Sequence, residues 1–251
     1  MIMANENKLL TIDTKIGNVI SENSLDRVIL RGRRFDEHSE FIDNLNIIIN
    51  QSNGGPLKII STPYGGYNLQ LFLGDFNGDG RDDIMIRGDS GGSGGYAIAA
   101  IYTYNYNYRQ FIEIFNPDMF SNKYKFEAKY LDDYKVQVNS LTLNRKYIID
   151  ISAKPRVYLD LVYDNNGKVK ENITPTVSAI NAAYPIQTIY KESYSLFIRQ
   201  RIIGVNNADT LGVMESFVYL DDNNINVVDM GAFTFGEKLQ NDKLNNNDKL
   251  H

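Results

Sequence analysis

Residues 71–88 have the sequence LFLGDFNGDGRDDIMIRG, and this stretch decides the predicted fold. A short apolar run enters a loop of Asp, Asn and Gly, and a second apolar run leaves it. Apolar runs of this length, bounded by turn residues, are typical of β-strands. The stretch therefore predicts a β-hairpin with an acidic loop.

The acidic loop carries oxygen-bearing side chains at alternate positions. Its pattern, D-x-N-x-D-G-x-x-D, has Asp75, Asn77, Asp79 and Asp83 at positions 1, 3, 5 and 9. Arg81, at position 7, can contribute its main-chain carbonyl oxygen. Calcium binds six to eight oxygen ligands, so these five residues predict a Ca²⁺ site. The alternative is an acidic, glycine-rich turn without a metal.

An EF-hand does not explain this loop. The EF-hand needs a Glu at position 12, and that position is Ile86. Its flanks must also be amphipathic helices, whereas the flanks here have the pattern of strands. A calcium-binding β-hairpin is therefore the metal site that the sequence predicts.

The strand after the acidic loop has counterparts elsewhere in the chain. Val28-Ile-Leu-Arg-Gly resembles Ile84-Met-Ile-Arg-Gly, which begins 56 positions later. Leu196-Phe-Ile-Arg-Gln follows after twice that spacing, and the weaker match Ser140-Leu-Thr-Leu-Asn lies halfway. A fixed period is the signature of a repeat fold. The chain therefore divides into four units of about four strands, each the size of a propeller blade.

The rest of the chain is also rich in short strand candidates. A helix is the alternative for residues 156–161, and one helical turn is expected within 116–122. We expect a single β-propeller-like domain over 7–236, with disordered termini at 1–6 and 237–251. The expected strands are 8–13, 27–32, 45–49, 57–61, 69–74, 83–88, 95–108, 109–115, 124–131, 134–141, 145–151, 157–163, 186–190, 194–200, 212–220 and 225–230.

Composition limits the function classes. The 251 residues carry a net charge of −5, which disfavours nucleic acid and anionic membranes as partners. Cysteine is absent, so thiolate chemistry and disulfides are excluded. No apolar run approaches the roughly 20 residues of a membrane span, and we expect no signal peptide at the N-terminus.

The sequence LGDFNGDGRDDIMI resembles the FG-GAP/VCBS repeat, the calcium hairpin of integrin-alpha-like β-propellers. The chain is also similar to VCBS-repeat proteins of endospore-forming bacteria in three further segments, at 91–95, 96–108 and 143–151. The resemblance implies that Asp75, Asn77, Asp79 and Asp83 bind one calcium ion together with the Arg81 carbonyl. The other units lack such a ligand series, so the resemblance implies a single site.

Three arginines recur at matching positions of the repeat. If the units close into a ring, Arg31, Arg87 and Arg199 lie on one rim, where they could bind an anionic ligand. Main-chain amides of the glycine-rich loop, including Gly91 and Gly92, could complete that site. The alternative is that each arginine pairs with a neighbouring carboxylate.

Ser90 lies in the same loop, within the motif Gly-Asp-Ser-Gly-Gly. That motif surrounds the nucleophile of chymotrypsin-like proteases, which also need a histidine base and an aspartate. The chain has two histidines, and His38 lies too close in sequence to Ser90 for the two barrels of that fold. We therefore assign Ser90 to the weak ligand-binding loop and to no catalytic role.

The predicted protein is thus an all-β, calcium-stabilised binding or structural module. Its fold is a small or irregular propeller of four FG-GAP-like blades, with a β-sandwich as the alternative. Its rim is expected to take a protein or glycan partner. The competing hypothesis is a hydrolase with a carboxylate-based site on the rim.

Overall fold

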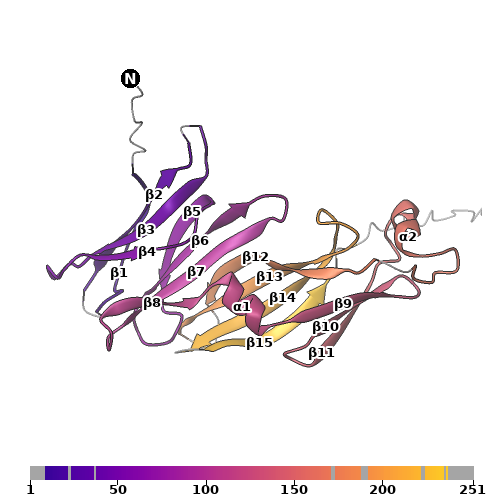
Figure 1. Ribbon diagram of the computed structural model, residues 1–251. Helices are drawn as coiled ribbons and strands as arrows, with labels where there is room; N and C mark the ends of the chain where they lie inside the picture. The colour runs from indigo at the N-terminus through magenta and orange to yellow at the C-terminus, as the bar shows by residue number, and fades with distance from the viewer. Residues whose placement is uncertain are drawn as a thin grey trace, which may run out of the picture.

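The computed structural model describes residues 9–21, 24–36, 38–170, 173–187, 192–221, 224–234 and 236. Within these segments the chain forms fifteen β-strands and two short α-helices (Figure 1). The strands pair into four antiparallel sheets, in which strands adjacent in sequence are adjacent in space. The all-β prediction is therefore confirmed.

Each sheet is a meander of consecutive strands, as expected where short turns join antiparallel neighbours. We number the sheets I to IV in chain order. Sheet I holds β1 (Leu10–Gly17), β2 (Asp26–Arg34), β3 (Ile42–Asn50) and β4 (Lys58–Ser61); sheet II holds β5 (Tyr67–Gly74), β6 (Asp83–Gly91), β7 (Tyr96–Asn105) and β8 (Gln110–Phe115); sheet III holds β9 (Phe126–Leu131), β10 (Lys135–Ser140) and β11 (Arg145–Asp150); sheet IV holds β12 (Thr176–Gln187), β13 (Tyr194–Ile203), β14 (Thr210–Asp221) and β15 (Asn224–Phe233).

The repeat seen in the sequence corresponds to these sheets. Val28 lies in β2, Ile84 in β6, Ser140 at the end of β10 and Leu196 in β13. All four positions fall in the second strand of their sheet. The predicted division into four units of about four strands agrees with these sheets, of which three have four strands and sheet III has three.

Three hydrophobic cores hold the sheets together, and each lies between two sheets. Successive side chains of a strand point to opposite faces, so β6 can serve two cores. Ile84 and Ile86 belong to the core with sheet I, whereas Met85 belongs to the core with sheet IV. Sheet IV shares the second core through Ile198 and the third core, with sheet III, through Ile202.

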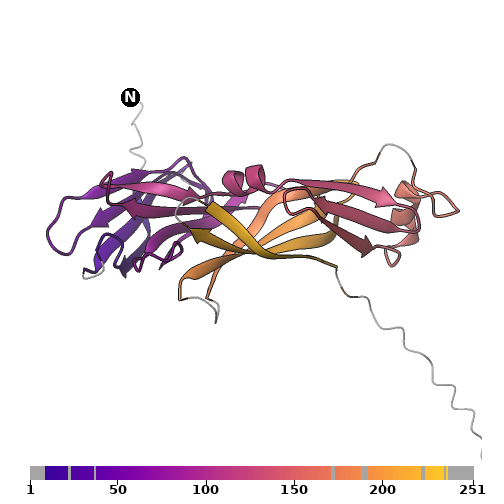
Figure 2. The same cartoon turned by 90° about the horizontal axis from the view of Figure 1, so that it is seen from below.

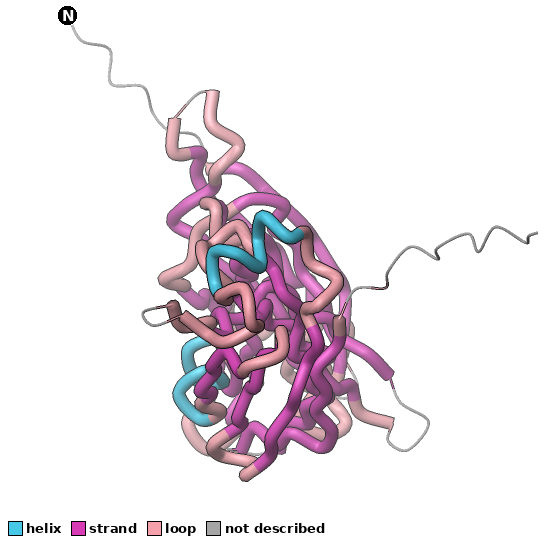
Figure 3. Tube along the Cα trace, turned by 90° about the vertical axis from the view of Figure 1, so that its right-hand side faces the viewer, coloured by secondary structure: helices cyan, strands magenta, loops and turns pink. Residues whose placement is uncertain are grey.

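The sheets therefore follow one another in space in the order I, II, IV, III. Sheets I and III lie at opposite ends of an elongated molecule (Figures 1 and 2). Seen from the sheet III end, the sheets overlap in a much narrower outline (Figure 3). A closed propeller would need sheet I to meet sheet III, so the propeller prediction is not confirmed. Packing of sheets face to face is compatible with the sandwich alternative.

Two of the expected strands differ from the structure, and the expected helical turn is present. Residues 157–163, expected as a strand, lie mostly in helix α2 (Arg156–Val162), so the helical alternative is correct. The expected turn near residue 116 is helix α1 (Pro117–Lys123), whose first turn is capped by Asn116 because its Oδ1 accepts from the Met119 amide at 2.8 Å. Strand β12 was expected only from residue 186, although it begins at Thr176.

The expected disorder of residues 1–6 and 237–251 lies outside the described residues. In the described part, no helix has the length and apolar character that a membrane crossing requires.

Candidate functional site

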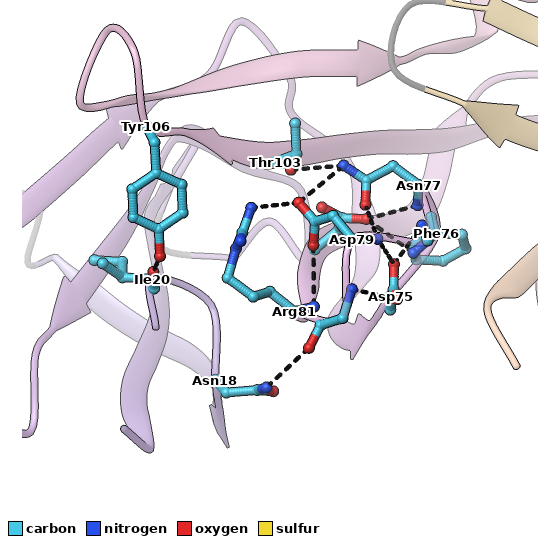
Figure 4. A network of polar contacts seen from close by, with 12 residues as sticks. Asn18, Ile20, Asp75, Phe76, Asn77, Asp79, Arg81, Thr103 and Tyr106 are labelled. Carbon is cyan, nitrogen blue, oxygen red and sulfur yellow. Dashed lines mark hydrogen bonds and ion pairs between the residues drawn. The ribbon is translucent and has the colours of Figure 1, made fainter. Parts of the chain in front are cut away.

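The acidic loop, residues 75–82, is held closed by its own main-chain amides (Figure 4). Asp75 directly follows β5, and its Oδ1 accepts hydrogen bonds from the amides of Gly78 at 2.6 Å and Asp79 at 3.2 Å. Its Oδ2 accepts from the Gly80 amide at 2.9 Å. Gly78 and Gly80 have φ values of 81° and 82°, which glycine adopts without strain. Both carboxylate oxygens of Asp75 therefore accept hydrogen bonds from the loop.

The side chains of Asn77 and Asp79, in the middle of the loop, also accept hydrogen bonds from loop amides. Asn77 Oδ1 accepts from the Asp79 amide at 3.2 Å, and Asp79 Oδ1 accepts from the Arg81 amide at 3.0 Å. The Arg81 guanidinium forms a short ion pair with the other carboxylate oxygen, Asp79 Oδ2 (Figure 4). The charge of Asp79 is therefore balanced by an arginine of the same loop.

Asp83 begins β6 and lies beneath the loop with 1% of its surface exposed. Its Oδ2 accepts from the amides of Phe76 at 2.8 Å and Asn77 at 3.2 Å. Burial raises the pKa of the Asp83 carboxyl to about 7, although hydrogen bonds from Thr103 and from the Phe76 amide act in the opposite direction. This carboxyl therefore holds a proton more readily than an exposed aspartate.

These contacts bear on the calcium site expected from the sequence. The oxygens of Asp75, Asn77 and Asp79 accept loop N–H groups and keep further lone pairs, but the Arg81 guanidinium lies against Asp79 Oδ2, where its charge would compete with a cation. Among the described residues, no group of three or more His, Cys, Asp or Glu is placed to hold a metal ion. Ca²⁺ as a cofactor stays a prediction from the sequence.

The acidic loop also joins three sheets. Asp82, its last residue, accepts a hydrogen bond at 3.0 Å from the amide of Asn18, which directly follows β1 of sheet I. The Arg81 guanidinium lies 4.5 Å from the ring centre of Tyr106, whose hydroxyl donates to the Ile20 carbonyl oxygen (Figure 4). The first amide of β13 in sheet IV, that of Tyr194, donates to the Asp75 carbonyl oxygen at 2.6 Å. The loop therefore connects sheet II to sheets I and IV.

The structure brings two of the three predicted arginines into neighbouring cavities. Arg31 lies in sheet I, whereas Arg87 and Arg199 line two cavities that meet at β12. Arg87 Nη2 donates to Gln70 Oε1 at 3.0 Å. Arg199 Nε lies 2.9 Å from Glu215 Oε1, so the alternative of pairing with a carboxylate holds for Arg199.

These two cavities form what we call the β12 cleft. The first, of about 250 Å³, lies between sheet II and β12, and the second, of about 300 Å³, lies over β12, β13 and β14. They share Asn181 and Ala182. Their other lining residues are Asn68, Gln70, Arg87, Gly88, Asp89, Ala97, Ile98, Ala183 and Tyr184 in the first, and Arg199, Gln200, Arg201, Thr210 and Val213 in the second.

The cleft depends on an irregularity in β12. The pairing of β12 with β13 shifts register between Val177 and Ile180 and again before Ala182. A bulge of this kind re-aims side chains and often lies beside functional sites. Here it lets Asn181 Oδ1 and Ser178 Oγ both accept from the Arg201 amide, at 3.0 and 2.9 Å.

The glycine-rich loop, residues 91–95, contributes to the cleft in a different way from the prediction. The carbonyl oxygens of Gly94 and Gly95, rather than loop amides, face sheet IV. Asn181 Nδ2 donates to both, and Arg201 Nη2 donates to Gly94 at 3.1 Å. Ser90 Oγ donates to the Tyr96 carbonyl oxygen at 3.0 Å.

Gly91 ends β6 and Gly92 begins the turn after it, with φ values of 83° and 79°. Neither of them, nor Ser90, lines the cleft. Sequence reasoning missed Asn181, Arg201 and Tyr184, which do. The signal that was available is the partial alternation of polar and apolar residues in 176–187, which the register shifts at Ile180 interrupt and in which Pro185 is unusual for a strand. Because β12 is an edge strand, the missing amide of proline is tolerated there.

Comparison with known proteins identifies the family. Residues 124–232 match the family described as the YybI C-terminal domain, a range that runs from the start of sheet III into the last strand of sheet IV. Uncharacterized protein YybI of Bacillus subtilis (strain 168) is 35% identical over 203 residues, which cover 80% of this chain and 76% of that protein. No solved structure matches the chain.

These findings correct the assignment made from the acidic loop. The resemblance to FG-GAP/VCBS repeats rested mainly on one short loop, and the family that matches is a different one. The classification as a calcium-binding FG-GAP or VCBS protein is therefore wrong. Acidic, glycine-rich hairpins arise in unrelated folds because Asp, Asn and Gly all suit tight turns. The chain belongs to the YybI family.

Proposed function

We propose that this protein is a non-enzymatic binding module that holds a protein or glycan partner in the β12 cleft. The observation that carries the proposal is the meeting of two cavities, of about 250 and 300 Å³, over Asn181 and Ala182. Concave sites with a few well-placed polar groups are the usual form of ligand sites.

The scaffold around the cleft supports this role. The acidic loop connects sheets I, II and IV through Asn18 and Tyr194, and Asn181 fastens the glycine-rich loop to β12. A binding site on rigid elements loses less conformational entropy when the ligand binds. We therefore propose that the acidic loop has a structural role and that the cleft has the binding role.

The hydrolase alternative has no observation in its favour. Carboxylate-based hydrolysis needs two carboxyl groups facing one another across a cleft. Among the residues that line the two cavities, Asp89 is the one carboxylate, and its Oδ2 accepts from Asn68 Nδ2 at 2.8 Å. A single hydrogen-bonded carboxylate supports positioning of a ligand rather than acid–base catalysis.

The test uses Ala182, which both cavities share. The purified chain is titrated calorimetrically with hexasaccharides of glucose, N-acetylglucosamine and galacturonate, and with hexapeptides of glutamate and of lysine. We expect saturable binding of at least one of these ligands and its loss in Ala182→Trp, which fills the groove.

The matched control is Ala179→Trp, on an exposed position of the same strand. It is expected to bind as the unmodified chain does. Binding of none of the five ligands, or equal binding by the Ala182→Trp variant, contradicts the proposal. Release of reducing sugar or free amino acid from any of the ligands would favour the hydrolase instead.

A further inference from the structure

We infer that the ligand of the β12 cleft is an acidic glycan, whose sugar rings stack on an aromatic row of sheet IV while its carboxylates meet two arginines beside that row. This inference rests on the proposed function and specifies its ligand class. It is carried by the outer face of sheet IV, the face opposite the hydrophobic cores. That face bears Tyr184, Phe197, Phe217, Arg199 and Arg201.

Strand alternation places these side chains on one face. In β13, the buried residues Leu196 and Ile198 alternate with Phe197, Arg199 and Arg201, so the second set points away from the cores. Residues directly opposite in antiparallel strands share a face. The partners of the β13 residues in β12 and β14 therefore complete the outer face.

Three aromatic side chains form a row across the strands. Tyr184 of β12 is paired with Phe197, and Phe197 is paired with Phe217 of β14. The rings of Phe197 and Phe217 have their centroids 5.3 Å apart. Tyr184 is 49% exposed and Phe217 is 40% exposed, so the row presents neighbouring apolar surface to solvent, and contiguous surface of this kind marks interaction sites. The flat faces of sugar rings suit such a surface.

The arginines lie one and two pairs further along the same face. Arg199 is opposite Ala182 on one side, where the small side chain leaves space, and opposite Glu215 on the other. Arg201 donates to the Gly94 carbonyl oxygen, to Asn207 Oδ1 and to Thr210 Oγ1, all of which are neutral. In the described part of the chain, Arg201 forms no ion pair.

The positive charge of Arg201 is therefore not balanced by a carboxylate among the described residues, and an anionic ligand could pair with it. Arg87, at the other end of the cleft, is in the same situation, because its bond to Gln70 Oε1 is to a neutral group. A guanidinium binds a carboxylate through two parallel N–H···O bonds. An acidic oligosaccharide supplies both features of the surface, since its rings carry apolar faces and its carboxylates repeat along the chain.

The test compares two ligands that differ in charge and by one methyl group per sugar. Hexagalacturonate and its methyl ester are titrated into the full chain by calorimetry. We expect the ester to bind at least about tenfold more weakly than the acid, because the carboxylate–arginine bonds are lost. Arg201→Gln is expected to weaken hexagalacturonate binding by about tenfold. Arg145→Gln, the same change on an exposed residue of sheet III, is expected to leave it unchanged.

A second variant keeps the test valid if Arg201→Gln fails to fold. Glu215 holds the Arg199 guanidinium at 2.9 Å and competes with a ligand carboxylate for it. Glu215→Gln is therefore expected to strengthen hexagalacturonate binding, by about threefold or more. A residue that served only folding would not give a gain of affinity. Equal binding of the acid and its ester, or an unchanged affinity in Glu215→Gln, overturns the inference.

The failure of this inference can be told apart from failure of the proposed function. If a neutral hexasaccharide or a hexapeptide binds instead, and Ala182→Trp abolishes that binding, the cleft is a binding site for another ligand and the acidic-glycan inference is wrong. If no ligand of either series binds, both proposals are wrong.

Discussion

The Asn181 side chain donates hydrogen bonds to the carbonyl oxygens of Gly94, at 2.9 Å, and Gly95, at 2.8 Å. These glycines precede Asn181 by 87 and 86 positions, so two bonds fasten the β6–β7 connection of sheet II to the edge of sheet IV. The Oδ1 atom of the same side chain accepts from the Arg201 amide at 3.0 Å. A single residue in the β12 bulge thus positions both the glycine-rich loop and the β13 arginine.

Asn181→Ala tests this fastening. The substitution leaves the Gly95 carbonyl oxygen without its side-chain donor and removes one of two side-chain bonds at the Gly94 oxygen and at the Arg201 amide, so we expect a loss of about 1–3 kcal/mol in the free energy of unfolding. Amide hydrogen exchange in residues 91–95 should accelerate. Asn122→Ala, on the exposed surface of α1, is the control and should change stability by less than about 0.5 kcal/mol. Equal effects of the two substitutions would contradict the assignment.

Asp83 gives the stability a pH dependence of known sign. The pKa of its carboxyl is raised from 3.8 to about 7 by burial. Between these values the folded chain keeps a proton that the unfolded chain has released, so stability falls as the pH rises toward 7. Asp83→Asn removes the ionisable group while keeping an oxygen acceptor.

We expect Asp83→Asn to gain about 1–3 kcal/mol relative to the unmodified chain at pH 8 and clearly less at pH 5. Urea unfolding of both proteins at the two pH values measures the difference. A variant that is less stable at pH 8 by the same amount as at pH 5 would show that the ionised carboxylate is stabilising, contrary to this account.

Calcium and chelator distinguish the two accounts of the acidic loop. Because the loop is closed by its own amides and Arg81 balances the charge of Asp79, we expect the thermal midpoint to be the same in calcium and in chelator. An ion at a hundred times its Kd would add about 2.7 kcal/mol, a shift of roughly 5–10 °C for a chain of this size. Such a shift, if abolished by Asp75→Ala, would establish the calcium site predicted from the sequence.

The range matched by the YybI C-terminal domain does not contain all of its core partners. Leu196 and Ile198 of sheet IV pack in the second core against Met85, Ile101 and Phe115 of sheet II. A fragment of residues 124–236 exposes this apolar surface, so we expect a lower thermal midpoint than the full chain and strong binding of a hydrophobic dye. A fragment that unfolds cooperatively at the midpoint of the full chain would show that sheets III and IV are an independent domain.

Local patterns were enough to predict most strands and the division into four units. The repeat from Val28 to Leu196 marks the second strand of each sheet, because each unit alternates apolar and polar residues in the same register. The same local patterns could not predict the order in which the sheets pack against one another. Burial of β6 on both faces places sheet II between two others, but which sheets they are depends on contacts distant in sequence.

The candidate site was the least predictable part, because it lies along β12, the strand whose first ten residues were not predicted. The β12 bulge interrupts the alternation near Ser178, and Pro185 is unusual within a strand. The arginines of the repeat did indicate the region, since Arg87 and Arg199 line the cleft. Arg201, Asn181 and the role of the glycine carbonyls follow only from tertiary contacts.

The central claim is that the ligand binds in the β12 cleft and on the aromatic row, which begins at Tyr184 in the wall of that cleft. The chain contains no tryptophan, so Tyr184→Trp introduces a single fluorescent reporter at that row. Titration of this variant with hexagalacturonate is predicted to give a saturable change in tryptophan emission, with a midpoint equal to the calorimetric Kd of the same variant. Saturable binding in the calorimeter without any change in emission would place the ligand elsewhere and contradict the account.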